Sequence, residues 1–137
     1  MNTNLETAIY GKLSGSTLTG LIGGRMYNTV APDKAEYPYV VFNVYVNYHT
    51  RAFQRDYSNY RVQFSSFSLS RSLTEINSIS AAILSLYDDQ PITITGQTTI
   101  LMAVDTENQI TEEHDTPSGT EEVTHTIQEF NVMTITS

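Results

Sequence analysis

The sequence has no cysteine, and no run of apolar residues approaches the length of a membrane-spanning helix. Without cysteine, disulfide bonds, thiol nucleophiles and thiolate metal ligands are excluded together. A bilayer-spanning helix needs roughly 20 apolar residues, and the first residues, MNTNLETAIY, lack the basic and apolar parts of a secretion signal. We therefore expect a soluble protein that is made in the cytoplasm and does not contact a membrane.

Basic residues are absent from the second half of the sequence. All seven lie between Lys12 and Arg71, and residues 1–71 contain four acids, so this part of the chain carries a net charge of +3. Residues 72–137 hold eleven acids and no base, and the whole chain has a net charge of −8. Tight binding to phosphates needs a basic surface. The charge therefore disfavours general nucleic-acid binding, and it divides the chain into two electrically different halves.

No residue pattern typical of an enzyme is present. The three histidines stand outside any HExxH motif, the serines have no GxSxG context, and the glycines near residue 23 lack the lysine of a phosphate loop. His114 lies among Glu112, Glu113 and Asp115 and could bind a divalent cation weakly, but a solvated acidic loop explains the same residues. We expect no catalysis, no metal and no cofactor.

The length of 137 residues predicts one compact domain with one core. Thr3 and Glu6 form a capping box, and Leu5, Ile9 and Leu13 follow at helical spacing, which predicts a helix that ends before Gly15. A second helical turn is expected over residues 16–22, closed by the two glycines that follow it. A brief strand is expected at residues 25–27.

Two long strands are expected in the middle of the chain. Apolar residues alternate in the first of them, at positions 40, 42, 44, 46 and 48. The second, residues 59–68, carries Tyr60, Val62 and Phe64 on one side. The two should pair antiparallel, with residues 49–58 as the loop between them.

A longer amphipathic helix should follow, because apolar residues recur at helical intervals after a capping box formed by Ser72 and Glu75. These residues are Leu69, Ile76, Ile79, Ile83 and Leu86. The helix should pack on Val40, Phe42, Val44 and Val62. The fold class predicted from these elements is α+β, a mainly antiparallel sheet with two or three helices packed on one face.

The acidic segment 105–125 has a turn signal at residues 116–119 and predicts an extended β-hairpin arm. Strands are expected before it, over residues 92–105 with a break near Gly96, and after it at residues 130–135. Both faces of the arm are polar, so it should have little to bury within its own chain. Such an arm is either mobile in the free subunit or ordered by a neighbour.

The segment YHTRAFQRDYSNYR, residues 48–61, interleaves aromatic residues with arginines. That mixture suits stacking on nucleic-acid bases as well as protein interfaces, and the acidic whole favours an interface. We expect the basic half of one copy to contact the acidic half of another. The candidate subunit-interface residues are Tyr45, Arg51, Arg55, Arg61, Glu112, Glu113, Glu121 and Glu122.

Three segments carry a resemblance to a known family. They are LIGGRMYN (residues 21–28), YPYVVFNV (residues 37–44) and QEFNVMTI (residues 128–135), in this order around the predicted helices and strands. With this arrangement the chain resembles the tail-terminator, or tail-completion, proteins of long-tailed phages and prophages. The resemblance gives Arg25, Tyr27, Pro38 and Tyr39 a role in forming the fold.

The resemblance implies a structural virion protein at the head-facing end of the tail. It implies an α+β subunit in a ring, usually of six copies, that stops growth of the tail tube and offers a surface to the head. Expected partners are copies of the chain, the tail-tube protein and a head–tail connector or neck protein, while DNA passes through the lumen without specific binding. Two alternatives stay open: a neck or head-closure ring protein, and a small module that binds polysaccharide or nucleic acid.

Overall fold

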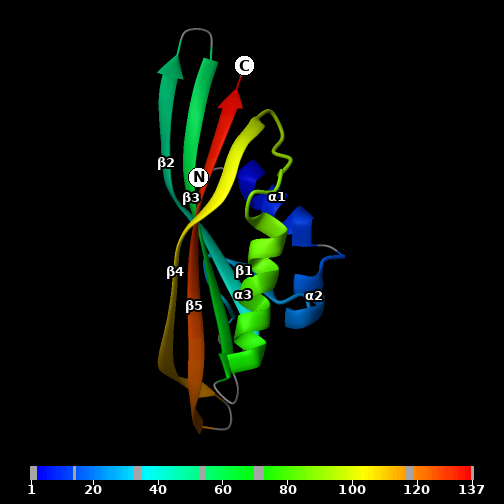
Figure 1. The fold of residues 1–137 in the computed structure, drawn as a ribbon. Helices are drawn as coiled ribbons and strands as arrows, with labels where there is room; N and C mark the ends of the chain where they lie inside the picture. The colour runs from blue at the N-terminus through cyan, green and yellow to red at the C-terminus, as the bar shows by residue number, and fades with distance from the viewer. Residues whose placement is uncertain are drawn as a thin grey trace.

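The computed structural model of the protein describes residues 3–13, 15–32, 35–52, 55–69, 73–116 and 119–136. A long twisted sheet runs through the molecule, and the helices of the described residues cover one of its faces (Figure 1). The helices are α1 (Thr3–Leu13), α2 (Thr17–Ile22) and α3 (Leu73–Tyr87), and the strands are β1 (Met26–Asn28), β2 (Tyr39–Ala52), β3 (Arg55–Leu69), β4 (Thr98–Thr116) and β5 (Gly119–Thr136). The predicted α+β class is confirmed.

The five strands lie in the order β1-β2-β3-β5-β4. The short β1 is parallel to β2, and every other neighbouring pair is antiparallel. Successive side chains of a strand point to opposite sides of the sheet. Phe42, Phe64 and Phe130 therefore share the side that α1 and α3 cover, here called the helix face, while Tyr39 and Phe67 lie on the opposite side, the outer face.

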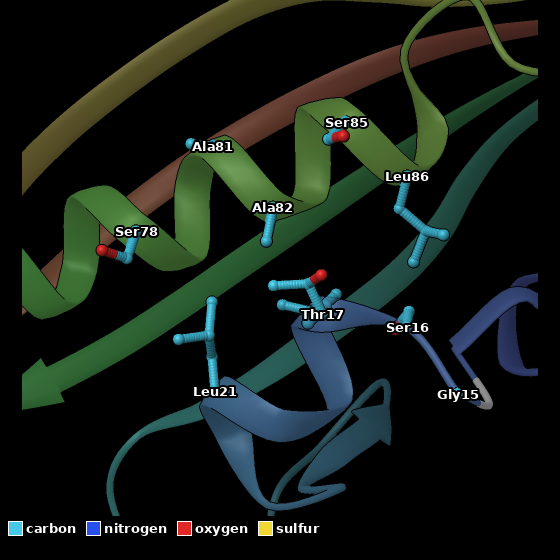
Figure 2. Close-up of a pocket in the computed structure, with 10 residues that line it drawn as sticks. Gly15, Ser16, Thr17, Leu21, Ser78, Ala81, Ala82, Ser85 and Leu86 are labelled. Carbon is cyan, nitrogen blue, oxygen red and sulfur yellow. The ribbon is translucent and has the colours of Figure 1, made fainter.

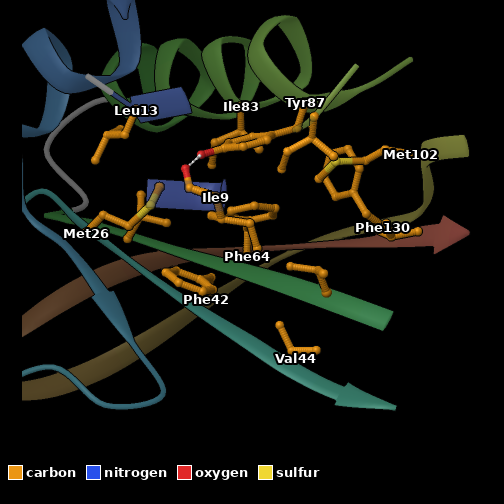
Figure 3. Close-up of a cluster of buried hydrophobic side chains, with 14 of the residues drawn as sticks. Ile9, Leu13, Met26, Phe42, Val44, Phe64, Ile83, Tyr87, Met102 and Phe130 are labelled. Carbon is orange, nitrogen blue, oxygen red and sulfur yellow. Dashed lines mark hydrogen bonds between the residues drawn. The ribbon is translucent and has the colours of Figure 1, made fainter. Parts of the chain in front are cut away.

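An aromatic cluster on the helix face forms the centre of the core (Figure 3). The ring of Phe64 stacks on Tyr87 at a centroid distance of 4.8 Å and meets Phe130 edge-on at 5.4 Å. The buried Tyr87 hydroxyl donates a hydrogen bond of 2.8 Å to the carbonyl of Ile9. This bond joins the end of α3 to the middle of α1, so both helices are fixed over the same part of the sheet.

The two short helices form for local reasons that the sequence predicted. Leu5, Ile9 and Leu13 recur at intervals of four, and all three are buried in the core. Ser16 caps α2 by accepting a hydrogen bond from the backbone N–H of Thr19. Gly23 ends α2 at φ 61°, a left-handed conformation in which a side chain would be strained.

The predicted phase of the long helix is confirmed at three of its positions. Ile76, Ile79 and Ile83 are fully buried. Two of the predicted helix residues differ: Leu69 is the last residue of β3, and Leu86 is only partly buried. Tyr87, four residues after Ile83, takes the final core position instead, because its ring reaches the aromatic cluster. The predicted capping residue Ser72 lies outside the described residues.

The hairpin of β2 and β3 is longer than predicted. Strand β3 begins at Arg55, so most of the expected loop over residues 49–58 is strand. A β-bulge lies between Val44 and Val46, so that Val46 pairs with Arg61 and residue 47 pairs with Tyr60. The bulge shifts the alternation by one residue, and the single apolar face predicted through residue 48 ends at Val44.

The predicted acidic hairpin is formed by β4 and β5, and it projects from the end of the sheet opposite to the β2–β3 hairpin (Figure 1). Strand β5 pairs with β3 along the full length from Asp56↔Thr136 to Leu69↔Val123. Val123, Thr124 and Thr126 are buried. The expectation that this segment has little to bury is therefore wrong for residues 123–125, and only residues 113–122 reach beyond the end of β3.

Candidate subunit interface

Two candidate arginines and several candidate acids lie at opposite ends of the molecule. Arg51 and Arg55 belong to the end of the β2–β3 hairpin, where the backbone pairs Arg51 with Asp56. Glu113, Asp115 and Glu122 belong to the end of the β4–β5 hairpin (Figure 1). The side chains of residues 45–55, which include the candidate Tyr45, are outside the described part of the structure, so these candidates are placed by their backbone alone.

Arg61 pairs with acids of its own chain. Its guanidinium lies 2.5 Å from Asp105 on β4 and 3.1 Å from Glu129 on β5, and it donates a further hydrogen bond of 3.1 Å to Asn131. The Arg61 side chain is 29% exposed, so solvent screens these pairs only in part. One base of the first half of the sequence is therefore neutralised by two acids of the second half within the same copy. These ion pairs join three neighbouring strands on the outer face.

Glu112 is anchored to the body of the molecule. Its carboxylate lies 2.7 Å from Nδ1 of His125 on β5 and 3.8 Å from Nε2 of His114. The hydroxyl of Tyr37, in the segment before β2, lies 2.8 Å from Nδ1 of His114. The interpretation of this region as a solvated acidic loop is therefore wrong for Glu112 and His114.

A band of rings crosses the outer face beside this anchor. Tyr27 on β1 contacts Tyr39 on β2, Tyr39 stacks on Phe67 of β3 at 4.9 Å, and Phe67 stacks on His125 at 4.2 Å. Burial raises the pKa of Tyr39 to about 12. Burial also lowers the pKa of His125, and the Glu112 carboxylate opposes that change.

The remaining acidic candidates stand at the end of the hairpin. Glu113 pairs directly with Glu122 across the two strands, and both side chains are exposed. Glu121 pairs with His114 and is partly buried. Like charges directly opposite each other destabilise a strand pair. The hairpin thus carries exposed acids in a place where they weaken its own pairing.

A surface groove of about 710 Å³ separates α2 from α3 (Figure 2). Leu21 and Leu86 border it, and small residues of α3 form its floor. None of the lining residues titrates near neutral pH, so the groove offers no acid or base for catalysis. The lining residues are Gly15, Ser16, Thr17, Leu18, Leu21, Ser78, Ala81, Ala82, Ser85 and Leu86.

In residues 3–13, 15–32, 35–52, 55–69, 73–116 and 119–136, no group of three or more histidine, aspartate or glutamate side chains is placed to hold a metal ion. No helix in the same ranges is long and apolar enough to cross a membrane.

The sequence matches the family model described as "Tail completion protein gp17" over residues 7–135. The chain belongs to this tail completion family. It is accordingly a structural protein of the virion and a component of a phage tail, and membership of such a family implies a structural rather than an enzymatic role.

Solved structures show that the fold of this tail completion protein is shared. A chain from the "Virion of native gene transfer agent (GTA) particle" aligns with a TM-score of 0.67 and 12% sequence identity, over 93% of this chain and 94% of that chain. At this identity the likeness is one of fold. No curated protein matches the sequence of this tail completion protein.

Sequence reasoning missed the residues that hold the outer face together. Asp105 and Glu129 reach Arg61, and Tyr37 reaches His114, only because strands far apart in sequence lie side by side. One signal was present: Glu129 alternates with the apolar Phe130 just as Arg61 alternates with Val62, so both lie opposite the core. Which strands pair could not be deduced from that alternation.

Proposed function

We propose that this tail completion protein forms a ring of six copies at the head-proximal end of the phage tail tube. There it ends growth of the tube and provides the surface to which the head is joined. The observation that carries the proposal is the family match over residues 7–135. The shared fold with a chain from the virion of a gene transfer agent particle supports it.

The shape and charge of the subunit support two different docking ends. The β2–β3 and β4–β5 hairpins project in opposite directions (Figure 1), with Arg51 and Arg55 on the first and the exposed Glu113 and Glu122 on the second. In a ring whose axis runs along the strands, the two hairpins would lie at the two opposite faces of the ring. One end would then meet the tail-tube protein and the other the connector or neck protein of the head.

The net charge of −8 supports passage of DNA through the ring without specific binding. A lumen that exposes acids repels phosphates, so DNA slides past it rather than adhering. The exposed Glu113 and Glu122 are the acids best placed for this role.

Electron microscopy of the purified protein, alone and mixed with assembled tail tubes, tests the proposal. We expect a ring at one end of each tube and tubes that no longer lengthen when fresh tube protein is added. Tubes in a matched sample without the protein should keep lengthening. Binding along the side of the tubes, or continued growth with the protein bound, would refute the proposed role.

Separation of assembly intermediates distinguishes the proposal from a neck or head-closure ring. A tail-terminating ring should co-purify with tails that have not yet met a head. If it is found only on heads that lack tails, the neck function replaces the one proposed.

A further inference from the structure

Strand β2 has an open edge along its far half. Strand β1 pairs only with Val40–Phe42, so residues 43–52 have β3 as their one neighbour among the strands that the structure describes. No acid occurs anywhere in β2, while His49 and Arg51 lie near its end. One edge of the sheet is therefore open to a further strand, and the strand that forms this edge contains no acid.

Strand β4 forms the opposite edge, and only part of it is covered. The carboxylate of Asp88 accepts a hydrogen bond of 2.8 Å from the N–H of Val104, and the carbonyl of Met102 accepts one of 2.8 Å from the N–H of Asp89. The turn after α3 thus provides hydrogen-bond partners for the backbone of β4 at residues 102 and 104. Beyond it, residues 106–116 border no further strand in the described part of the chain.

The acids of β4 determine which strand can pair with this edge. Glu107, Glu112, Glu113 and Asp115 all lie within the open stretch, and Ile110 beside them is 40% exposed. Two β4 strands paired with each other would bring like charges together, which disfavours that contact. A strand without acids is the matching partner, and β2 contains none.

Strand direction agrees with this pairing. Because β2, β3, β5 and β4 are each antiparallel to the next, β2 and β4 run in opposite directions. A rotation that relates copies around a ring axis preserves the direction of a strand along that axis. The β2 strand of one copy therefore meets the β4 strand of the next antiparallel, the pairing that is slightly more stable per residue.

A shift of neighbouring copies along the strand direction brings the open stretch of β2 beside the open stretch of β4. Phe42 and Glu107 lie in one row across the sheet, through Phe64 and Gln128. Strands of a closed barrel tilt by about 35–45°, which over four strand spacings of about 4.8 Å shifts the next copy by roughly four to six residues. In the direction that joins the open stretches, residue 46 of one copy then lies beside residue 108 of its neighbour.

We propose that β4 residues 106–111 of one copy pair with the far half of β2 of the next copy, so that the sheets of all subunits join into one closed sheet. This inference rests on the proposed ring and specifies the contact that closes it. Each copy uses both edges, one for each neighbour, and the acids of β4 prevent the edge from pairing with another β4.

Disulfide trapping tests the pairing, and the absence of native cysteine makes it clean. The double variant Val46→Cys/Asn108→Cys is oxidised after assembly, and Thr106→Cys or Ile110→Cys replaces Asn108→Cys to cover one register step in each direction. Within one chain β2 and β4 are separated by two strands, so the two cysteines stand at least roughly 14 Å apart and cannot form a bond that needs about 7 Å or less. Any disulfide is therefore between copies.

We expect a ladder of covalent oligomers larger than dimers on a non-reducing gel. Val46→Cys/Gln109→Cys is the matched control, because residue 46 pairs with outer-face Arg61 whereas Gln109 pairs with helix-face Thr126. It should give no ladder. A dimer from Asn108→Cys alone would show β4–β4 pairing and overturn the inference.

Sedimentation of the same samples before oxidation separates the two proposals. Rings that form without any ladder overturn the edge pairing and leave the proposed function standing. If no ring forms with or without tail tubes, both fail.

Discussion

The imidazole of His125 lies between the ring of Phe67 and the carboxylate of Glu112. Burial lowers its pKa and Glu112 acts in the opposite direction, with His114 a further group that lowers it. Because the folded protein holds this histidine less protonated than the unfolded chain does, its contribution to stability is complete above the unfolded pKa of about 6.5. The contribution is lost as the pH falls through the folded pKa.

We therefore expect the urea midpoint of unfolding to fall between pH 7 and pH 5.5, and His125→Gln to make this dependence shallower. Glu112→Gln removes the group that raises the pKa of His125, so in that variant the loss should continue to lower pH. Unfolding curves followed by circular dichroism at several pH values measure both effects. Identical pH profiles for the natural protein and His125→Gln would show that this histidine does not carry the dependence.

At the scale of elements, α3 is held to the sheet by its isoleucines. Ile79→Ala should reduce the free energy of unfolding by about 2–5 kcal/mol, because the truncation removes buried methyl groups and leaves a cavity. Leu73→Ala is the matched control, since Leu73 lies on the same helix with 56% exposure and should change stability much less. Chemical denaturation of both variants gives the comparison. Equal losses would mean that the helix packs through a different face.

The end of the β4–β5 hairpin is weakened by its own charges. Glu122→Lys places a base opposite Glu113, so the strand pair should gain about 0.2–1 kcal/mol. Hydrogen exchange of the amides at residues 110–122 should slow accordingly. The double variant Glu113→Lys/Glu122→Lys restores a like-charged pair and should lose the gain. Equal exchange in the two variants would show that the pair does not couple.

The spacing of apolar residues predicted the helices and strands, but it did not predict which strands pair or in which register. The buried face of α3 could be predicted from Ile76, Ile79 and Ile83, because their helical spacing depends on no other part of the chain. The bulge after Val44 and the early start of β3 at Arg55 depend on which residues of the partner strand lie opposite, which a single strand does not encode. For the same reason the sequence indicated the acids of the candidate interface but not the anchoring of Glu112 by His125.

At the scale of the whole molecule, copies with a net charge of −8 repel one another. Complementary edges select which surfaces meet, but such complementarity contributes more to specificity than to affinity. Salt screens the repulsion over about 8 Å at physiological ionic strength. We therefore expect the isolated protein to be largely monomeric at low salt and to assemble as salt or Mg²⁺ is added.

Sedimentation velocity across a salt series measures this trend. The variant Glu113→Gln/Glu122→Gln, which removes two exposed acids, should assemble at lower salt than the natural protein. Glu36→Gln, an 83% exposed acid outside both hairpins, is the control for the chemical change and should shift the trend less. Assembly that weakens with salt would mean that attraction between unlike ends dominates.

The uninterrupted pairing of β3 with β5 also has a mechanical consequence. The ladder runs from Asp56↔Thr136 to Leu69↔Val123 without a register shift, parallel to the line that joins the two hairpin ends. Tension between those ends acts along the strands, so the hydrogen bonds of the ladder share the load and must rupture together instead of opening one after another. Under the proposed function, the tensile strength of the junction between head and tail would rest on the shear resistance of this single strand pair.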